Sequence, residues 1–137
     1  MRTAHAPRRI LRSPWRPGPA LPPVGPVLVG VTDFTARGHG RAAAVALAGL
    51  RLRRTWPTTR GAVGMWLWAD PLHRRSGSVS VWVDERALKE FLRRPDHVRV
   101  MRRHGGHGEL RSARREFEEF APESVWAYAL DLITEER

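Results

Sequence analysis

Three segments of the chain alternate between two kinds of side chain, and each is predicted to form a strand. Within residues 27–34, 63–68 and 78–83, Val, Met or Leu recurs at every second position, except that Asp33 follows Val31 in the first segment. Because side chains point alternately to the two sides of a strand, each segment has an aliphatic face and a mixed face. The mixed positions are Leu28, Gly30, Thr32, Phe34, Gly64, Trp66, Trp68, Ser78, Ser80 and Trp82. We expect helices to cover the aliphatic face and leave the mixed face for a subunit interface or a ligand cavity.

Helical spacing appears between and after these strands. Residues 41–54 repeat small apolar side chains at helical intervals, and Asp84 is a suitable N-cap for a second helix. Pro95 should interrupt that helix, so that residues 96–104 form a separate short helix. A last helix is expected from Pro122 onward, where Pro occupies the first turn.

Residues 110–120 fit either a strand or a helix, and we interpret them as a strand. The preceding elements have the order βαββα, and one more strand would complete the sheet. The predicted class is therefore α+β: a ferredoxin-like βαββαβ antiparallel sheet with helices on one face, plus a C-terminal helix. Because the mixed face would then lie uncovered, we expect a second copy of the chain to cover it in a homodimer.

The charge of the chain divides it into two regions. The formal net charge is +10, and residues 1–26 contain five Arg, many Pro and no acidic residue. This composition predicts a disordered basic arm followed by one domain at residues 27–137. Three interpretations of the arm stay open: a tail that binds polyanions weakly, a linker, or a stretch produced by an upstream start codon chosen in error.

Composition also excludes several classes of site. The 137 residues contain no Cys, so the chain has no disulfide, no thiolate metal ligand and no Cys nucleophile. No apolar run approaches the roughly 20 residues that cross a bilayer, so we expect no membrane contact and a cytoplasmic location. Phosphate-binding Gly-rich loops and the common hydrolase motifs are also absent from the sequence.

Residues 77–97 carry a more specific pattern: a strand ending in Trp, an acidic helix cap, a helix, and a Pro-Asp-His end. The residues concerned are Trp82, Asp84, Ala87, Phe91, Pro95, Asp96 and His97. In this pattern the segment resembles the antibiotic-biosynthesis-monooxygenase-like proteins, which are dimeric α/β barrels. Arg94 stands where that pattern has Ser. By element order the resemblance extends over residues 27 to about 120.

This resemblance implies a homodimer that handles a small molecule, such as an aromatic or polyketide-like substrate of secondary metabolism. Some members of the family oxygenate aromatic polyketides without a cofactor, some degrade haem, and others have no known reaction. The haem-degrading branch uses an Asn on its first strand, and this chain contains no Asn. We therefore expect no cofactor, haem included, whereas it stays open whether the protein is an enzyme and what its substrate is.

His97 is the candidate catalytic residue, since an imidazole titrates near neutral pH and could act as an acid or base. Its alternative role is to cap the interrupted helix or pack at the dimer interface. The candidate substrate pocket consists of Phe34, Trp66, Trp68, Ser80 and Trp82. The Trp residues could equally form the core of the dimer.

The sequence also raises the question of a metal site and of nucleic-acid binding. The spacing of His97, His104 and His107 would place them on one side of a continuous helix, as a metal site could use. However, Gly105-Gly106 interrupts that helix and several Arg give the segment positive charge, so no metal site is predicted. A non-catalytic ligand-binding or nucleic-acid-binding ferredoxin-like module is the alternative function, suggested by the excess of Arg. The third strand lacks the aromatic motif of RNA-recognition sheets, which counts against nucleic acid.

Overall fold

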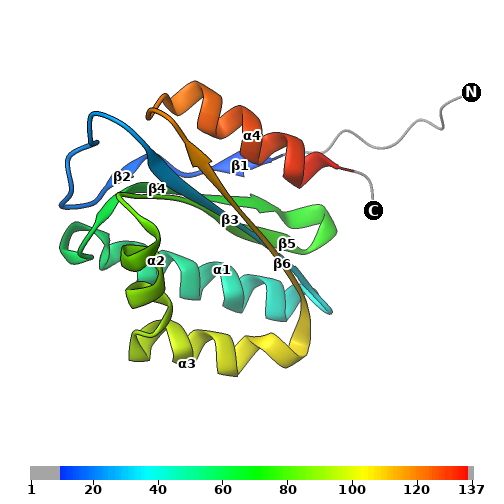
Figure 1. Ribbon diagram of the computed structural model, residues 1–137. Coiled ribbons are helices and arrows are strands. Elements are labelled where there is room, and N and C mark those ends of the chain that lie inside the picture. Colours follow the sequence, from blue (N-terminus) through cyan, green and yellow to red (C-terminus); the bar gives the residue numbers. More distant parts are fainter. Residues whose placement is uncertain (1–9, 136–137) are drawn as a thin grey trace, which may run out of the picture.

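The structure is a computed structural model that describes residues 10–135, and these residues combine one antiparallel sheet with four α-helices (Figure 1). The long strands are β3 (Val27–Ala36), β4 (Ala62–Asp70), β5 (Arg75–Trp82) and β6 (Gly108–Phe117). The helices are α1 (His39–Arg54), α2 (Glu85–Leu92), α3 (Pro95–His104) and α4 (Pro122–Thr134). Short 3-10 turns join them at η1 (Trp56–Thr58), η2 (Pro71–His73) and η3 (Gly105–His107).

The long strands lie in the order β4-β5-β3-β6, and every pairing is antiparallel. This order confirms the predicted ferredoxin-like βαββαβ sheet. The ambiguous residues 110–120 are a strand for most of their length, because β6 pairs with β3 from Val27↔Phe117 to Ala36↔Gly108. Asp84 caps α2 as expected, since its Oδ1 accepts a hydrogen bond of 2.9 Å from the Ala87 N–H.

Helices α1, α2 and α3 lie on one face of the sheet, and α4 crosses the other (Figure 1). The prediction of which face the helices cover is wrong. The aliphatic residues of β3 and β5 pack against α4, in one core whose fully buried members include Val29, Val81, Val125, Ala129 and Ile133. The mixed positions of β3 and β5 face α1, α2 and α3 instead. Within residues 10–135, Trp66, Trp68 and Trp82 are all buried, so the uncovered Trp face expected from the sequence is not found there.

The prediction fails because of β4. The Trp residues of this strand lie on the same side of the sheet as the aliphatic residues of β3 and β5. A register shift between Ala62 and Gly64 breaks the regular alternation, and beyond it Trp66 lies opposite Val79 and Met65 opposite Ser80. Trp66 and Trp68 are therefore part of the core under α4. A β-bulge changes which face the following residues occupy, and composition alone does not reveal it.

The N-terminal segment also differs from the predicted disordered arm. Two short strands, β1 (Leu11–Arg12) and β2 (Arg16–Pro17), pair with the outer edge of β4. Between them, the ring of Trp15 lies 4.5 Å from that of Trp66 and 5.5 Å from that of Phe120. Residues 10–20 thus cover a sheet edge and close one end of the α4 core; the rest of the predicted arm before them lies outside the described residues.

A buried ion pair ties α4 to the sheet. Arg75 donates to both carboxylate oxygens of Asp33, at 3.2 and 2.5 Å, and also donates to the Ile133 carbonyl oxygen at 2.7 Å. The Ile133 carbonyl belongs to the last turn of α4, where backbone acceptors lack partners within the helix. This pair places a buried charged contact beside the apolar core under α4.

Candidate functional site

The candidate site is a cavity of about 830 Å³ between the sheet and the layer formed by α1, α2 and α3. Its floor comes from β3, β4, β5 and β6, and its roof from the three helices and Trp56 of η1. Most of the lining is apolar, which suits a largely apolar ligand.

Helix α1 explains why the space exists. The side of α1 that faces the sheet carries Val45, Ala46 and Gly49, which line the cavity. None of the 16 residues of α1 is fully buried, although the helix lies over the sheet. A helix normally buries one apolar stripe against its neighbour. In α1 the apolar stripe of Val45, Ala46 and Gly49 borders the cavity, so its surface is available to a ligand.

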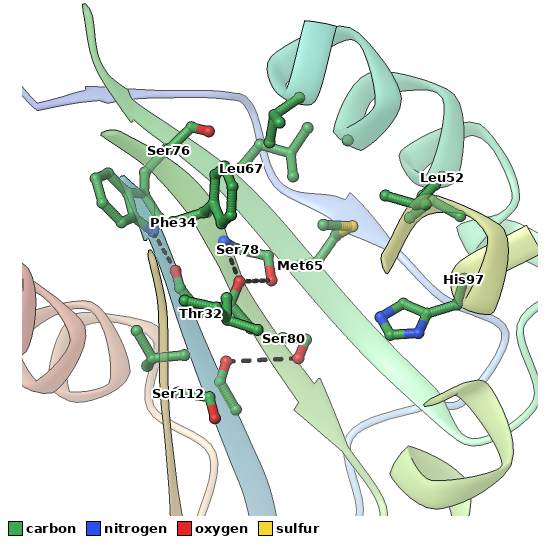
Figure 2. Close-up of a pocket in the computed structure, with 18 of the residues that line it drawn as sticks. Thr32, Phe34, Leu52, Met65, Leu67, Ser76, Ser78, Ser80, His97 and Ser112 are labelled. Carbon is green, nitrogen blue, oxygen red and sulfur yellow. Dashed lines mark hydrogen bonds between the residues drawn. The ribbon is translucent and has the colours of Figure 1, made fainter. Parts of the chain in front are cut away.

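The floor of the cavity carries hydroxyl groups on three adjacent strands. Thr32 of β3 lies between Ser78 of β5 and Ser112 of β6 in the sheet register, and all three line the cavity (Figure 2). The hydroxyls of Thr32 and Ser78 are 2.8 Å apart, and the Ser78 N–H donates to Thr32 Oγ1 at 2.9 Å. Small polar side chains in this row leave room above the sheet while offering a ligand hydrogen bonds.

His97 enters the cavity from the helical side, at the start of α3 (Figure 2). Its Nδ1 lies 3.2 Å from the carbonyl oxygen of Leu92. A carbonyl oxygen can only accept, so Nδ1 carries a proton, and in the neutral ring Nε2 has a free lone pair. His97 therefore offers the cavity a base or hydrogen-bond acceptor of defined tautomer.

Burial keeps this ring neutral. Desolvation lowers the pKa of His97 below its ordinary value of 6.5, and the nearby positive charge of Arg94 acts in the same direction. The hydrogen bond to Leu92 and the carboxylate of Asp96 oppose that effect. Since the net direction is downward, His97 is unprotonated at neutral pH and able to accept a proton.

Arg94 fixes the corner between α2 and α3 that presents His97. Its guanidinium forms an ion pair with Asp96 and donates to the hydroxyls of Thr55 and Thr59, each at 2.8 Å. Asp96 Oδ1 in turn accepts the His97 N–H at 2.8 Å. The corner is thus bonded to the end of α1 and to the turn after it, which limits how far the imidazole can shift.

The residues predicted to form the pocket divide into two groups. Phe34, Trp68, Ser80 and His97 line the cavity. Trp66 does not: it packs on the other side of the sheet, 5.7 Å from the ring of Trp126 on α4. The ring of Trp68 also belongs to that core, and its Nε1 donates to the Thr32 carbonyl oxygen at 3.0 Å.

Trp82 lies beneath the cavity wall rather than on its surface. It is fully buried, and its ring contacts those of Trp56 and Phe91, at centroid distances of 5.2 and 5.4 Å. Its Nε1 donates to Ser80 Oγ at 2.9 Å. Trp82 therefore acts through Ser80, whose hydroxyl it holds in place.

The His residues considered for a metal are not gathered at one point. His97 and His104 line the cavity, whereas His107 is exposed and is not part of the lining. In the part of the chain that the structure describes, no three His, Cys, Asp or Glu side chains are arranged to hold a metal ion.

Sequence reasoning missed several residues of the site. In the sequence, Arg94 stands out only as a departure from the family pattern, and Thr32 and Ser78 only as members of a mixed strand face. Arg41, which lies 3.2 Å from His104 Nδ1, was not singled out. One signal was present: hydroxyl residues occupy matching positions on neighbouring predicted strands.

The chain resembles known proteins in fold but not in sequence. No family model matches the sequence, and no curated protein matches it. Solved structures do match in fold. SnoaB from Streptomyces nogalater, a cofactor-independent oxygenase, aligns with a TM-score of 0.58 and 16% identity over 70% of this chain and 97% of its own.

Two further structures are similar to the same extent. An antibiotic biosynthesis monooxygenase aligns with a TM-score of 0.57 and 12% identity, covering 69% of this chain and 99% of its own. A dimeric ferredoxin-like protein of unknown function from Jannaschia sp. CCS1 aligns with a TM-score of 0.58 and 15% identity, covering 66% and 99%. The chain therefore has the ferredoxin-like fold of the antibiotic-biosynthesis-monooxygenase-like proteins.

Proposed function

We propose that this protein is a monooxygenase-like enzyme that binds a flat aromatic, polyketide-like molecule in the cavity and uses dioxygen without a cofactor. The observation that supports the proposal is the neutral imidazole of His97, whose Nδ1 is bonded to the Leu92 carbonyl so that Nε2 can accept a proton beside a large apolar cavity. Support of a second kind comes from the fold shared with SnoaB, described as a cofactor-independent oxygenase.

The chemistry assigned to His97 is proton removal from an activated carbon or phenol of the substrate. The resulting anion is electron-rich enough to reduce dioxygen, and a carbon–oxygen bond forms to give a hydroperoxide. Loss of a second proton from the same carbon and departure of hydroxide, which leaves as water, produce a carbonyl. A methylene group and dioxygen thus give a carbonyl and water, with His97 restored.

The test uses dithranol, a dihydroxylated anthrone whose ring methylene is acidic. We expect the protein to accelerate oxygen uptake above the spontaneous rate and His97→Ala to lower the rate by about 10²–10⁴-fold. His107→Ala, which changes an exposed His outside the lining, is the matched control. If His97→Ala consumes oxygen like the wild type while remaining folded, His97 is not the base.

A non-catalytic ligand-binding protein is the second candidate function. The cavity would serve binding equally well, because its lining is mostly apolar. Quenching of Trp fluorescence by dithranol without accelerated oxygen uptake would favour it. The nucleic-acid alternative needs aromatic side chains exposed on the sheet. Trp66, Trp68 and Trp82 are all buried here, which gives that alternative no support.

We also propose that the protein is a homodimer, although the uncovered Trp face first invoked for this is absent. The support is the dimeric ferredoxin-like relative from Jannaschia and the exposure of several large apolar side chains, among them Leu47 and Leu50 of α1. Light scattering after gel filtration at micromolar concentration should give twice the chain mass. As for membranes, none of the helices in the described residues is long and apolar enough to cross one.

A further inference from the structure

The N-terminal segment forms one side wall of the cavity. We call residues 10–20 the strap; its short strands β1 and β2 run along the outer edge of β4 (Figure 1). Leu11 and Ser13 line the cavity. Between them in the chain, the guanidinium of Arg12 lies over the rings of Trp66 and Trp126 on the α4 side, at 5.0 and 4.7 Å from their centroids. The strap therefore contacts both the cavity and the core under α4.

The strap is anchored on the α4 side. The ring of Trp15 packs on those of Trp66 and Phe120, at centroid distances of 4.5 and 5.5 Å. Gly64 of β4 leaves the space for this ring, because a Cβ at that position would lie 2.0 Å from Trp15 Cζ2. The sequence of β4 is thus adapted to a docked Trp15.

On the cavity side the strap is held mainly by polar contacts. The Ser13 N–H donates to the Leu67 carbonyl oxygen at 2.9 Å, and the Leu67 N–H donates to Ser13 Oγ at 2.9 Å. The Pro14 carbonyl oxygen accepts an exposed hydrogen bond of 3.1 Å from Arg53 Nη2 of α1. The Leu11 side chain is 56% exposed and adds little packing. Contacts of this kind, near the end of a chain, open at much lower cost than a packed core.

The cavity reaches solvent beside this part of the strap. Leu50 of α1 lines the cavity, is 48% exposed, and lies one turn before Arg53, the residue that bonds to the strap. Met101 and Leu110 also line the cavity and are 38% and 43% exposed, which gives a second candidate entrance between α3 and β6. The first entrance differs in being bordered by a strand of two residues.

We propose that the strap is the gate of the cavity: residues 11–13 lift from the edge of β4 to admit an apolar molecule, while Trp15 stays seated on the α4 core as the hinge. The backbone groups that separate when the gate opens lie at a sheet edge, where water can replace their hydrogen bonds. This inference concerns access to the cavity and does not depend on the reaction proposed inside it.

The test clamps the gate with a disulfide. The chain contains no Cys, so two introduced thiols have no competing partner. Leu11→Cys with Ala69→Cys joins residues that lie opposite each other in the sheet. Cα atoms of such a pair are about 4.5–5.5 Å apart, which is within the range that a disulfide spans. The protein oxidised with diamide is compared with the same protein in dithiothreitol, and stopped-flow fluorescence follows the entry of Nile red, a neutral apolar dye.

We expect oxidation to slow both association and dissociation of Nile red by about tenfold or more and to leave Kd nearly unchanged, because a gate alters the rates and not the closed complex. Arg16→Cys with Met65→Cys is the matched control, a clamp across another opposite pair beyond Trp15. Since that part of the strap stays seated, its oxidation should change neither rate.

Three results would overturn the gate. Equal rates for the oxidised and reduced forms of the first variant, with the disulfide verified by mass, would move the entrance to Met101 and Leu110. A changed Kd with an unchanged association rate would make the strap a fixed wall. Absence of dye uptake by the reduced protein, or failure of the thiols to pair, would mean that residues 11–13 do not open or do not lie on β4. The oxygen-uptake test of His97 is a separate measurement, so a strap that proves to be a fixed wall leaves the proposed function standing.

Discussion

The two faces of this sheet differ in how closely the helices α4 and α1 pack on them. On one face, α4 presses Val125, Ala129 and Ile133 into a core in which all three are completely buried. On the other, α1 runs across the same strands with no fully buried residue and borders a cavity of about 830 Å³. The difference indicates that α4 is packed closely on its face of the sheet, whereas on the other face close packing is confined to the cluster around Trp56, Trp82 and Phe91 and α1 borders open space.

The sharpest test of this division is a pair of truncations to Ala. Ile133→Ala removes a fully buried side chain from the α4 face, and we expect it to cost about 2–5 kcal/mol in the free energy of unfolding. Leu50→Ala removes a side chain of similar size that lines the cavity and is 48% exposed, so its cost should be below about 1 kcal/mol. Urea unfolding measures both. Equal losses would mean that the two faces are packed alike.

Residues 11–13 of the N-terminal segment line the cavity, whereas Trp15 packs on the core under α4, and truncating Trp15 should reveal this contribution. Trp15→Ala deletes the ring that packs on Trp66 and Phe120, and we expect a loss of about 2 kcal/mol, the value of burying one large side chain. Leu21→Ala changes a residue that is 86% exposed in the same segment and should have no measurable effect. If Trp15→Ala unfolds at the wild-type urea concentration, residues 10–20 are dispensable after all.

The cavity face should respond to pH through His97. Its lowered pKa keeps the base neutral, so kcat/KM for dithranol should stay level from neutral pH down to 6.5 and decline only below that value. The charged groups beside the ring are Arg94 and Asp96. Below the pKa the decline approaches tenfold per pH unit.

The free energy of unfolding should change with pH in the same direction as the rate. Below pH 6.5 the unfolded chain binds a proton at His97 more readily than the folded chain, so the free energy of unfolding should decrease there. His97→Ala should lack this component of the decrease. A rate that already declines above pH 6.5 would show that the base has an ordinary or raised pKa.

The smallest expected effect is an increase in the free energy of unfolding. Gly49 lies in the middle of α1, and a Cβ placed there would meet only Leu67 Cδ atoms, at 3.6 and 3.7 Å, which is ordinary contact. Gly49→Ala should therefore stabilise the protein by about 0.5–1 kcal/mol, because Gly is a poor helix former. Thermal unfolding gives the sign, and a destabilised variant would mean that α1 is packed more closely on the sheet than its exposure indicates.

The sequence is sufficient for the long strands, the helices and their order from residue 27 onward, because alternation and helical spacing are local signals. It does not predict β1 and β2, which are too short to show a period. The sequence predicts that the Trp residues of β4 share a face with the mixed positions of β5, and this is wrong. The bulge next to Val63 changes how β4 aligns with β5, so that Trp66 and Trp68 share a face with the Val residues of β5. The sequence indicated His97 and Phe34, but neither the tautomer of His97 nor the partnership of His104 with Arg41. Those depend on contacts between residues 63 positions apart in the chain, which no local pattern encodes.

The bond from His97 Nδ1 to the Leu92 carbonyl crosses the Pro95 corner between α2 and α3, and this gives it a second role. Because Leu92 ends α2 and His97 lies in the first turn of α3, this bond joins the two helices through the imidazole itself. A change in the angle between α2 and α3 would therefore also change the tautomer and the orientation of the ring.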